Sequence, residues 1–251
     1  MTLTIAVTSQ HVTERTPSLL RVAGLAKRYG EQHALVDIAF DVRAGEVLGL
    51  IGPNGAGKTT LLEALAGVIP VDAGDLLWRG APMPNARRRE AMFYLPDGLR
   101  PWEDAFVLRV LEFFAAVHGR TQAALAEAIR AVALEPVLRK RVSALSKGYA
   151  RRLMLALALL TPQPLLLMDE PFDGFDLRQT RDVMGLIRRV AAGGRTLVLA
   201  IHQLADAERV CDRFVLLAGG AVRGVGALTE LRAATELTSA AGLEDVFLAL
   251  T

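Results

Sequence analysis

The stretch from residue 52 to residue 60 constrains this chain more than any other. It has the sequence GPNGAGKTT, which matches the phosphate-binding pattern G-x-x-x-x-G-K-[ST]. The mostly apolar run at residues 46–51 predicts a buried strand before it, and residues 61–66 predict a helix after it. Because this pattern binds phosphate when it joins a strand to a helix, the sequence predicts a nucleotide triphosphate site rather than a chance glycine-rich turn.

The chemistry of this loop follows from its composition. Glycines let backbone N–H groups turn inward around the phosphates, and the N-terminus of the next helix adds a favourable dipole. Lys58 can reach the β- and γ-phosphates, and the hydroxyl of Thr59 can ligate Mg²⁺. The residues that we expect to contact the nucleotide here are Gly52, Pro53, Asn54, Gly55, Ala56, Gly57, Lys58, Thr59 and Thr60.

Composition limits where the protein can act. Its 251 residues can form one large α/β domain, and 52% of them are apolar, which raises the question of a membrane span. The most apolar window, residues 153–168, is interrupted by TPQP, and the start of the chain lacks the pattern of a secretory signal. We expect a cytoplasmic protein that is held at the membrane by a partner. The net charge of +2 gives no argument for nucleic acid.

The order of local patterns predicts one α/β core with additions. A loose tail is expected at residues 1–17, an antiparallel layer from strands within residues 19–40 and 74–80, and a surface loop at residues 81–89. Helices are expected within residues 103–160. Strands follow at 165–168, 196–201, 214–217 and 222–225, the last two joined by a turn at Gly219 and Gly220. Alternating strands and helices predict a mostly parallel sheet that is covered on both faces.

Two carboxylates provide the second half of the predicted site. Asp169 and Glu170 directly follow the apolar run at residues 165–168, at the strand end where α/β sheets bind their ligands. Asp169 can hold the hydration shell of Mg²⁺, and Glu170 can polarise a water for attack on the γ-phosphate. Acidic residues are common at strand ends, but in a chain with a phosphate loop they indicate phosphoryl chemistry.

Further motifs resemble those of the ATP-binding cassette (ABC) ATPases and occur in that family's order. Residues 145–149, LSKGY, resemble the signature motif LSGGQ, and residues 170–176 resemble the segment that ends in the D-loop aspartate, here Asp176. His202 closes a strand as the family's switch histidine does, and Tyr29 occupies the place of the aromatic residue that stacks on adenine. The resemblance covers nearly the whole chain after residue 18.

The resemblance implies how the site works. It implies ATP and Mg²⁺ as ligands, with Glu170, His202 and Lys58 as catalytic groups. Ser146 and Gly148 open an apolar helix, so their polar groups can face an anion, although Ser146 alone could be a plain helix cap. In the family this motif reaches the γ-phosphate bound on the opposite subunit, which implies a homodimer that encloses two ATP molecules.

The sequence departs from the family pattern at three positions. Asp97 stands where most members have Gln, so it could ligate Mg²⁺ more strongly but adds negative charge beside the γ-phosphate. Lys147 and Tyr149 replace a Gly and the Gln of the signature. Because Ser146 and Gly148 are retained, we expect ATPase activity. Arg151 and Arg152 are expected on the exposed side of the helix.

The implied partner is an integral membrane permease. The resemblance divides the chain into an ABC ATPase domain at residues 18–231, with a helical subdomain at about 97–160, and a helical tail at residues 232–251. That tail resembles those of bacterial exporter cassettes, so export is expected, with the permease contacting the surface around Asp97 and residues 103–119. The alternative is a soluble ABC ATPase that acts on ribosomes or DNA, but such proteins usually carry two cassettes or long insertions. A GTPase is disfavoured because no [NT]-K-x-D motif is present.

Overall fold

The computed structural model describes residues 18–251, so the tail expected at residues 1–17 lies outside the described residues. The strands are β1 (Ser18–Tyr29), β2 (Gln32–Arg43), β3 (Val47–Ile51), β4 (Ala73–Trp78), β5 (Ala81–Pro82), β6 (Met92–Leu95), β7 (Leu165–Asp169), β8 (Thr196–Ile201), β9 (Arg213–Ala218) and β10 (Ala221–Gly226). The helices are α1 (Lys58–Ala66), α2 (Asn85–Ala91), α3 (Val107–Val117), α4 (Gln122–Ala131), α5 (Lys147–Leu160), α6 (Leu177–Ala192), α7 (Leu204–Val210), α8 (Leu228–Ala234) and α9 (Leu243–Leu250). Two short 3₁₀ helices, η1 (Glu135–Val137) and η2 (Val142–Ala144), precede α5.

The central sheet has the strand order β10-β9-β3-β8-β7-β6. Its strands run parallel except β10, which turns back on β9 at Gly219 and Gly220 as the sequence predicts. Every residue of β3, β7 and β8 is buried, because both faces of the sheet are covered. The register aligns Ile51 with Ile201 and Asp169 with Ala200, so the carboxyl ends of β3, β7 and β8 lie level with one another.

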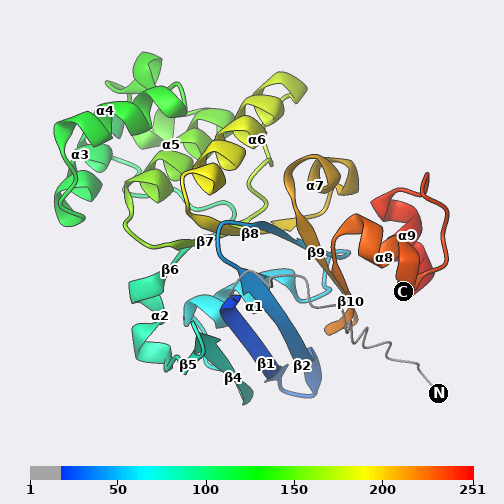
Figure 1. The fold of residues 1–251 in the computed structure, drawn as a ribbon. Helices are drawn as coiled ribbons and strands as arrows, with labels where there is room; N and C mark the ends of the chain where they lie inside the picture. Colours follow the sequence, from blue (N-terminus) through cyan, green and yellow to red (C-terminus); the bar gives the residue numbers. More distant parts are fainter. Residues whose placement is uncertain (1–17) are drawn as a thin grey trace.

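Two hydrophobic clusters form on opposite faces of this sheet. Val47 and Ile51 of β3 pack with apolar residues of α5, α6 and α7, whereas Leu48 and Leu50 pack with α1 and the second sheet. This alternation follows from the two-residue period of a strand. As a result, α1 lies between the central sheet and the second sheet, and α5, α6 and α7 cover the other face (Figure 1).

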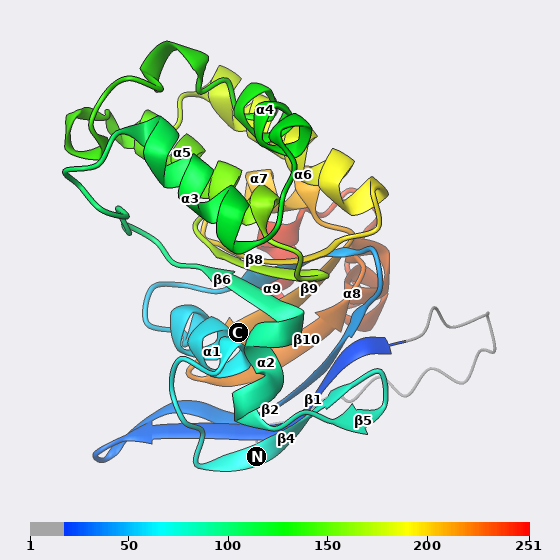
Figure 2. The same cartoon turned by 90° about the vertical axis from the view of Figure 1, so that its left-hand side faces the viewer.

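The second sheet is antiparallel, with the order β2-β1-β4-β5. It confirms the antiparallel layer predicted from the sequence, and its long hairpin β1–β2 packs residues such as Leu25 and Ile38 into the cluster around α1. On the other side of the molecule, α3, α4 and α5 pack together as a helical layer above the central sheet (Figure 2). None of the helices in residues 18–251 has both the length and the hydropathy needed to cross a bilayer.

Two segments differ from the prediction. The surface loop expected at residues 81–89 contains β5 and the start of α2, whose Arg88 is buried and donates to the carbonyl of Ala64 in α1. The strand β6 was not predicted, and it forms the edge of the central sheet by pairing in parallel with β7. In both cases, contact with another element determines the local structure.

Candidate functional site

The phosphate loop connects β3 to α1 and is shaped by two close contacts. Gly57 precedes α1 with a φ of 100°, and a Cβ added there would lie 2.6 Å from the carbonyl oxygen of Ala34. A Cβ on Gly52 would collide with the carbonyl of Leu217. At position 57 any other residue would have both an unfavourable φ and a side chain that collides with Ala34. The two glycines of the pattern therefore allow the loop to pack against β2 and β9. Residues 53–55 are exposed at its outer edge.

Lys58 is buried at the start of α1 and turns back over the loop. Its Nζ donates to the carbonyl oxygens of Gly52 at 2.7 Å and Pro53 at 3.3 Å. Burial lowers the pKa of Lys58, and the carboxylates of Glu170 and Asp169 partly oppose that effect. The ammonium group is therefore held at the centre of a loop whose N–H groups and helix dipole favour an anion.

Thr59 and Asp169 form a pair of oxygen ligands beside the loop. The Thr59 hydroxyl donates to Asp169 Oδ2 at 2.6 Å, and Asp169 is buried at the end of β7. Burial raises the pKa of Asp169, and the hydrogen bond from Thr59 lowers it. Within residues 18–251 no group of three His, Cys, Asp or Glu side chains could hold a metal alone. Because both atoms are hard oxygen donors, the pair fits Mg²⁺, which takes one or two protein oxygens together with phosphate oxygens and water.

Glu170 and His202 meet at the ends of β7 and β8. His202 Nδ1 lies 2.6 Å from Glu170 Oε2. Glu170 has a φ of 47°, which is uncommon for a residue with a side chain, and its N–H donates to the carbonyl of Ala200 at 3.0 Å. The parallel register brings the two side chains together, so the histidine can orient the carboxylate toward a water.

Asp97 is connected to this group by the buried side chain of Arg151, contrary to the prediction for Arg151. Arg151 was expected on the exposed side of α5, but its side chain is 6% exposed and donates to Asp97 Oδ1 at 2.7 Å. The helical period gave a signal for its burial, because Met154 and Leu155 lie three and four residues later and are also buried. Arg152 is partly buried and donates to the carbonyl of Val132 at 2.8 Å.

Four predicted site residues make their contacts outside this group. Tyr29 is 49% exposed at the end of β1, where Lys27 Nζ lies 5.2 Å from the centre of its ring. Ser146 caps α5 by accepting a bond from the N–H of Tyr149, and Asp176 caps α6 in a capping box with Gln179. Gly148 follows Ser146 in the first turn of α5.

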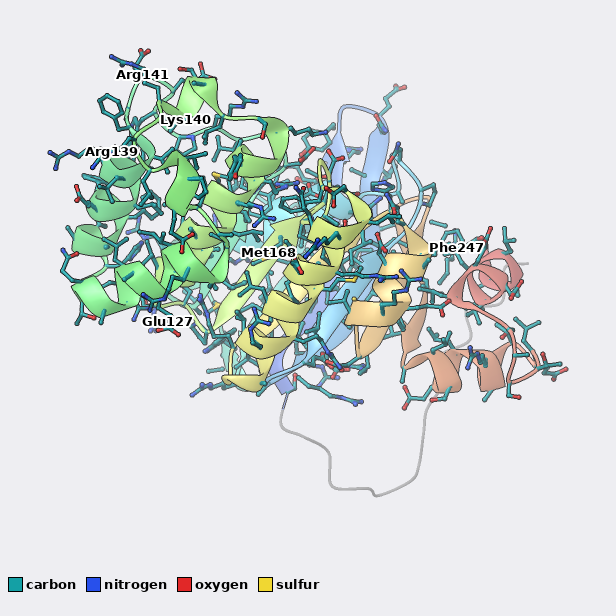
Figure 3. The ribbon with its side chains drawn as sticks, turned by 90° about the horizontal axis from the view of Figure 1, so that it is seen from above. Glu127, Arg139, Lys140, Arg141, Met168 and Phe247 are labelled. Carbon is teal, nitrogen blue, oxygen red and sulfur yellow. The ribbon has the colours of Figure 1, made fainter. Side chains whose placement is uncertain are left out.

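Of the two unusual residues of the signature segment, Tyr149 is partly buried against the cluster that contains α5, whereas Lys147 forms an ion pair. Lys147 Nζ pairs with Asp173 Oδ2 at 2.7 Å, so the start of α5 is joined to the segment after Glu170. Arg139, Lys140 and Arg141 point outward at the outer end of the helical layer, whereas Met168, next to Asp169, lies in the middle of the molecule (Figure 3). This basic run therefore belongs to the outer surface of the helical layer.

A phosphate loop at the carboxyl end of a parallel strand, with carboxylates at the end of β7, defines a P-loop nucleotide-binding protein. Residues 35–173 match the family model described as ABC transporter. The chain is 31% identical over 241 residues to the ABC-type transporter ATP-binding protein EcsA of Bacillus subtilis, covering 93% of this chain and 97% of that protein. The chain belongs to the ABC transporter family and, within it, to the ATP-binding subunits.

Other relatives and solved structures agree with this assignment. The Nod factor export ATP-binding protein I of Ralstonia nicotianae is 37% identical over 210 residues, but the matched region spans only 65% of its length and 80% of this chain. A solved ATP-binding subunit of an ABC transporter superposes with a TM-score of 0.84 and 31% identity, covering 93% of this chain and 99% of that one. A nucleotide-free ATP-binding cassette, with 20% identity and a TM-score of 0.74, shows the same fold.

Proposed function

We propose that this chain binds and hydrolyses ATP to drive export through a separate membrane permease. The observation that carries the proposal is the convergence of Lys58, the Thr59–Asp169 pair and the Glu170–His202 pair at one edge of the central sheet. Phosphoryl transfer to water requires a positive charge near the phosphates, oxygen ligands for Mg²⁺ and a base for the water. The ammonium group of Lys58, the Thr59–Asp169 pair and the carboxylate of Glu170 can provide these three functions.

The position of each of these residues suits one part of ATP binding or hydrolysis. Lys58 and the N–H groups of the loop bind the triphosphate, and Thr59 and Asp169, joined by Asp97, would hold Mg²⁺. When bound, Mg²⁺ would supply positive charge to the phosphate oxygens. Glu170 accepts a hydrogen bond from the attacking water, while His202 keeps its carboxylate in place. The buried setting of Lys58 strengthens its interaction with phosphate because little water competes.

We propose that two copies of the chain form the active unit. Ser146, Gly148 and Asp176 make local contacts and do not bond to the phosphate loop among the described residues. Ser146 and its neighbours nevertheless start a fourteen-residue helix whose N-terminus favours an anion. A second copy facing the loop would place this helix start against the terminal phosphate, as the resemblance implies.

The permease contact is proposed on the helical layer. Trp102, Phe106 and Phe113 are 52%, 46% and 53% exposed, and the ring of Trp102 packs edge-on against Phe113 with 5.0 Å between the ring centres. An exposed group of large aromatic side chains is typical of a protein interface. The group follows Asp97 along the chain, so a permease bound there would be connected to the site through residues 98–101. Such binding would hold the protein at the inner face of the cell membrane.

The relatives support transport, and export in particular. Their names refer to Nod factor export and to an ABC-type transporter. We propose that residues 18–231 form the ATPase domain, with a helical subdomain at about 97–160, and that residues 232–251 form a helical tail.

Replacing Glu170 tests the catalytic part of the proposal. We expect Glu170→Gln to slow ATP hydrolysis by roughly 10²–10⁴, because the general base is lost while the shape of the side chain is kept. Glu127→Gln is the matched control, since Glu127 is exposed on α4. ATP binding and phosphate release are measured for both variants. Near-normal turnover in Glu170→Gln would contradict the assignment.

Isolation of the native complex in mild detergent tests the transport part. We expect an integral membrane protein to co-purify with the chain and to be lost in a Trp102→Ser/Phe113→Ser double variant that still binds ATP. Association with ribosomes or DNA instead of a membrane protein would contradict transport and favour the alternative ABC ATPase.

A further inference from the structure

The buried guanidinium of Arg151 connects three segments of the site. One nitrogen, Nη2, donates to Asp97 Oδ1 at 2.7 Å, to the carbonyl oxygen of Asp169 at 3.2 Å and to the carbonyl oxygen of Glu170. The other terminal nitrogen, Nη1, lies 3.4 Å from the carbonyl oxygen of Pro96. A single side chain on α5 therefore contacts the end of β7 and the segment after β6 at the same time.

The contact with Glu170 holds a residue whose backbone conformation is unfavourable. Glu170 has left-handed backbone angles, which a residue with a side chain adopts only when its surroundings enforce them. Its N–H is held by the carbonyl of Ala200 on β8, and its carbonyl is held by Arg151 on α5. The same carbonyl also accepts from the N–H of Asp173 at 3.1 Å, so removing Arg151 would leave it with that local backbone donor alone, and we expect the direction of the carboxylate to change.

The contact with Asp97 balances a charge. Asp97 and Asp169 are both acidic, and the guanidinium of Arg151 lies 2.7 Å from Asp97 Oδ1 and 3.2 Å from the carbonyl oxygen of Asp169. The side chain of Asp97 is 48% exposed and that of Arg151 only 6%, so the pair sits at the edge of the buried carboxylates. Arg151 thus neutralises the extra negative charge that Asp97 brings toward the place of the terminal phosphate.

We propose that Arg151 is a positioning residue for ATP hydrolysis, which sets the direction of Glu170 and compensates the charge of Asp97. The inference rests on the proposed catalytic role of Glu170. Because α5 also packs against α3 and α4, Arg151 fixes the distance between the helical layer and the catalytic carboxylates. A shift of the helical layer would then act directly on the main chain of Glu170.

Variants at Arg151 and Asp97 test this role. Arg151→Gln should lower kcat by about tenfold to a hundredfold, because a small displacement of the catalytic carboxylate has a large effect on rate. ATP affinity should stay within about threefold, since Arg151 contacts no residue of the phosphate loop among the described residues. Adding Asp97→Asn to Arg151→Gln should recover part of kcat, because the unpaired carboxylate is removed. Arg151→Lys should be intermediate, since lysine keeps the charge but lacks the planar fork.

Arg152→Gln is the matched control on the same helix. Arg152 donates to the carbonyl of Val132 and lies over the ring of Phe175, so its loss should lower the melting temperature without lowering kcat of the folded protein. An unchanged kcat in folded Arg151→Gln would overturn the proposal. So would a kcat loss in Arg151→Gln that Asp97→Asn does not alter, or that Arg152→Gln reproduces at equal stability.

The outcome separates this inference from the proposed function. If Glu170→Gln keeps near-normal turnover, the catalytic assignment fails, and Arg151 has no catalytic carboxylate to position. If Glu170→Gln is inactive while Arg151→Gln has the kcat of the unmodified protein, only the role of Arg151 is refuted. Thermal unfolding of every variant establishes that the kinetic constants refer to folded protein.

Discussion

Substitution of Gly57 by alanine tests whether the shape of the phosphate loop depends on its packing. Gly57 ends the loop with a φ of 100°, and its missing side chain leaves room for the carbonyl of Ala34 on β2. Alanine at this position would need an unfavourable backbone angle and would also collide with β2. The loop would therefore move outward, and its N–H groups would lose their alignment with the phosphates.

The size of the effect can be worked out from these two contributions. The left-handed backbone costs alanine about 1–2 kcal/mol. The added Cβ would lie 2.6 Å from the Ala34 oxygen and 3.1 Å from Leu35 Cδ2, and relieving such overpacking costs about 1–3 kcal/mol. We expect the free energy of unfolding to fall by roughly 2–5 kcal/mol, which corresponds to about 4–20 °C in Tm for a chain of this length.

Thermal unfolding and ATP binding measure the effect, with Gly45→Ala as the control. Gly45 has a φ of 77° on the turn before β3, but an added Cβ would meet nothing within 4 Å, so this variant reports the backbone cost alone. Gly57→Ala should lose more stability than Gly45→Ala, and only Gly57→Ala should weaken ATP binding, by about tenfold or more. Equal losses of stability, or unchanged ATP affinity in Gly57→Ala, would refute the reasoning.

Three other changes have defined outcomes. Mixing a Ser146→Arg subunit with a Lys58→Ala subunit leaves one intact composite site in each mixed dimer, so about a quarter of the unmodified ATPase rate should return; activity no higher than that of the separate variants would argue against a shared site. Tyr29→Ala should weaken ATP binding by ~1–3 kcal/mol in a titration if the ring stacks on adenine, and unchanged affinity would limit Tyr29 to its contact with Lys27. Cys211 is partly buried and desolvation raises the pKa of its thiol, so a thiol reagent at about pH 8 should modify folded protein more slowly than unfolded protein; equal rates would contradict that raised pKa.

The sequence was most informative where local pattern and function coincide. The strand and helix on either side of the phosphate loop have clear periodicity, and β7 and β8 are apolar throughout because both faces of the sheet are covered. Asp169 and Glu170 were predicted from the end of the apolar run at residues 165–168 and His202 from the family resemblance, and the structure places all three at the same sheet edge. Parallel topology explains this convergence, since the carboxyl ends of neighbouring strands share one edge.

The predictions failed where a tertiary contact outweighs local composition. The arginine-rich start of α2 resembled a surface loop, yet Arg88 is buried because its guanidinium reaches the carbonyl of Ala64. Arg151 was placed in solvent because arginine is usually exposed, whereas here carbonyl and carboxylate oxygens compensate its burial. β6 is short, and pairing with β7 defines it as a strand. None of these partners can be identified from local sequence alone.

The register between β7 and β8 also determines the distance between two catalytic side chains. Ala200 faces Asp169, so the backbone ladder decides how far Glu170 and His202 stand apart. A slip of one residue would shift one side chain by about 3.3 Å and reverse the direction in which it points. The buried apolar residues of these strands therefore stabilise the core and also maintain the register that aligns the catalytic residues. A mutation in the core of the sheet that leaves the protein folded can still displace Glu170 relative to His202. Such a mutation would change the rate of ATP hydrolysis from a position far from the nucleotide.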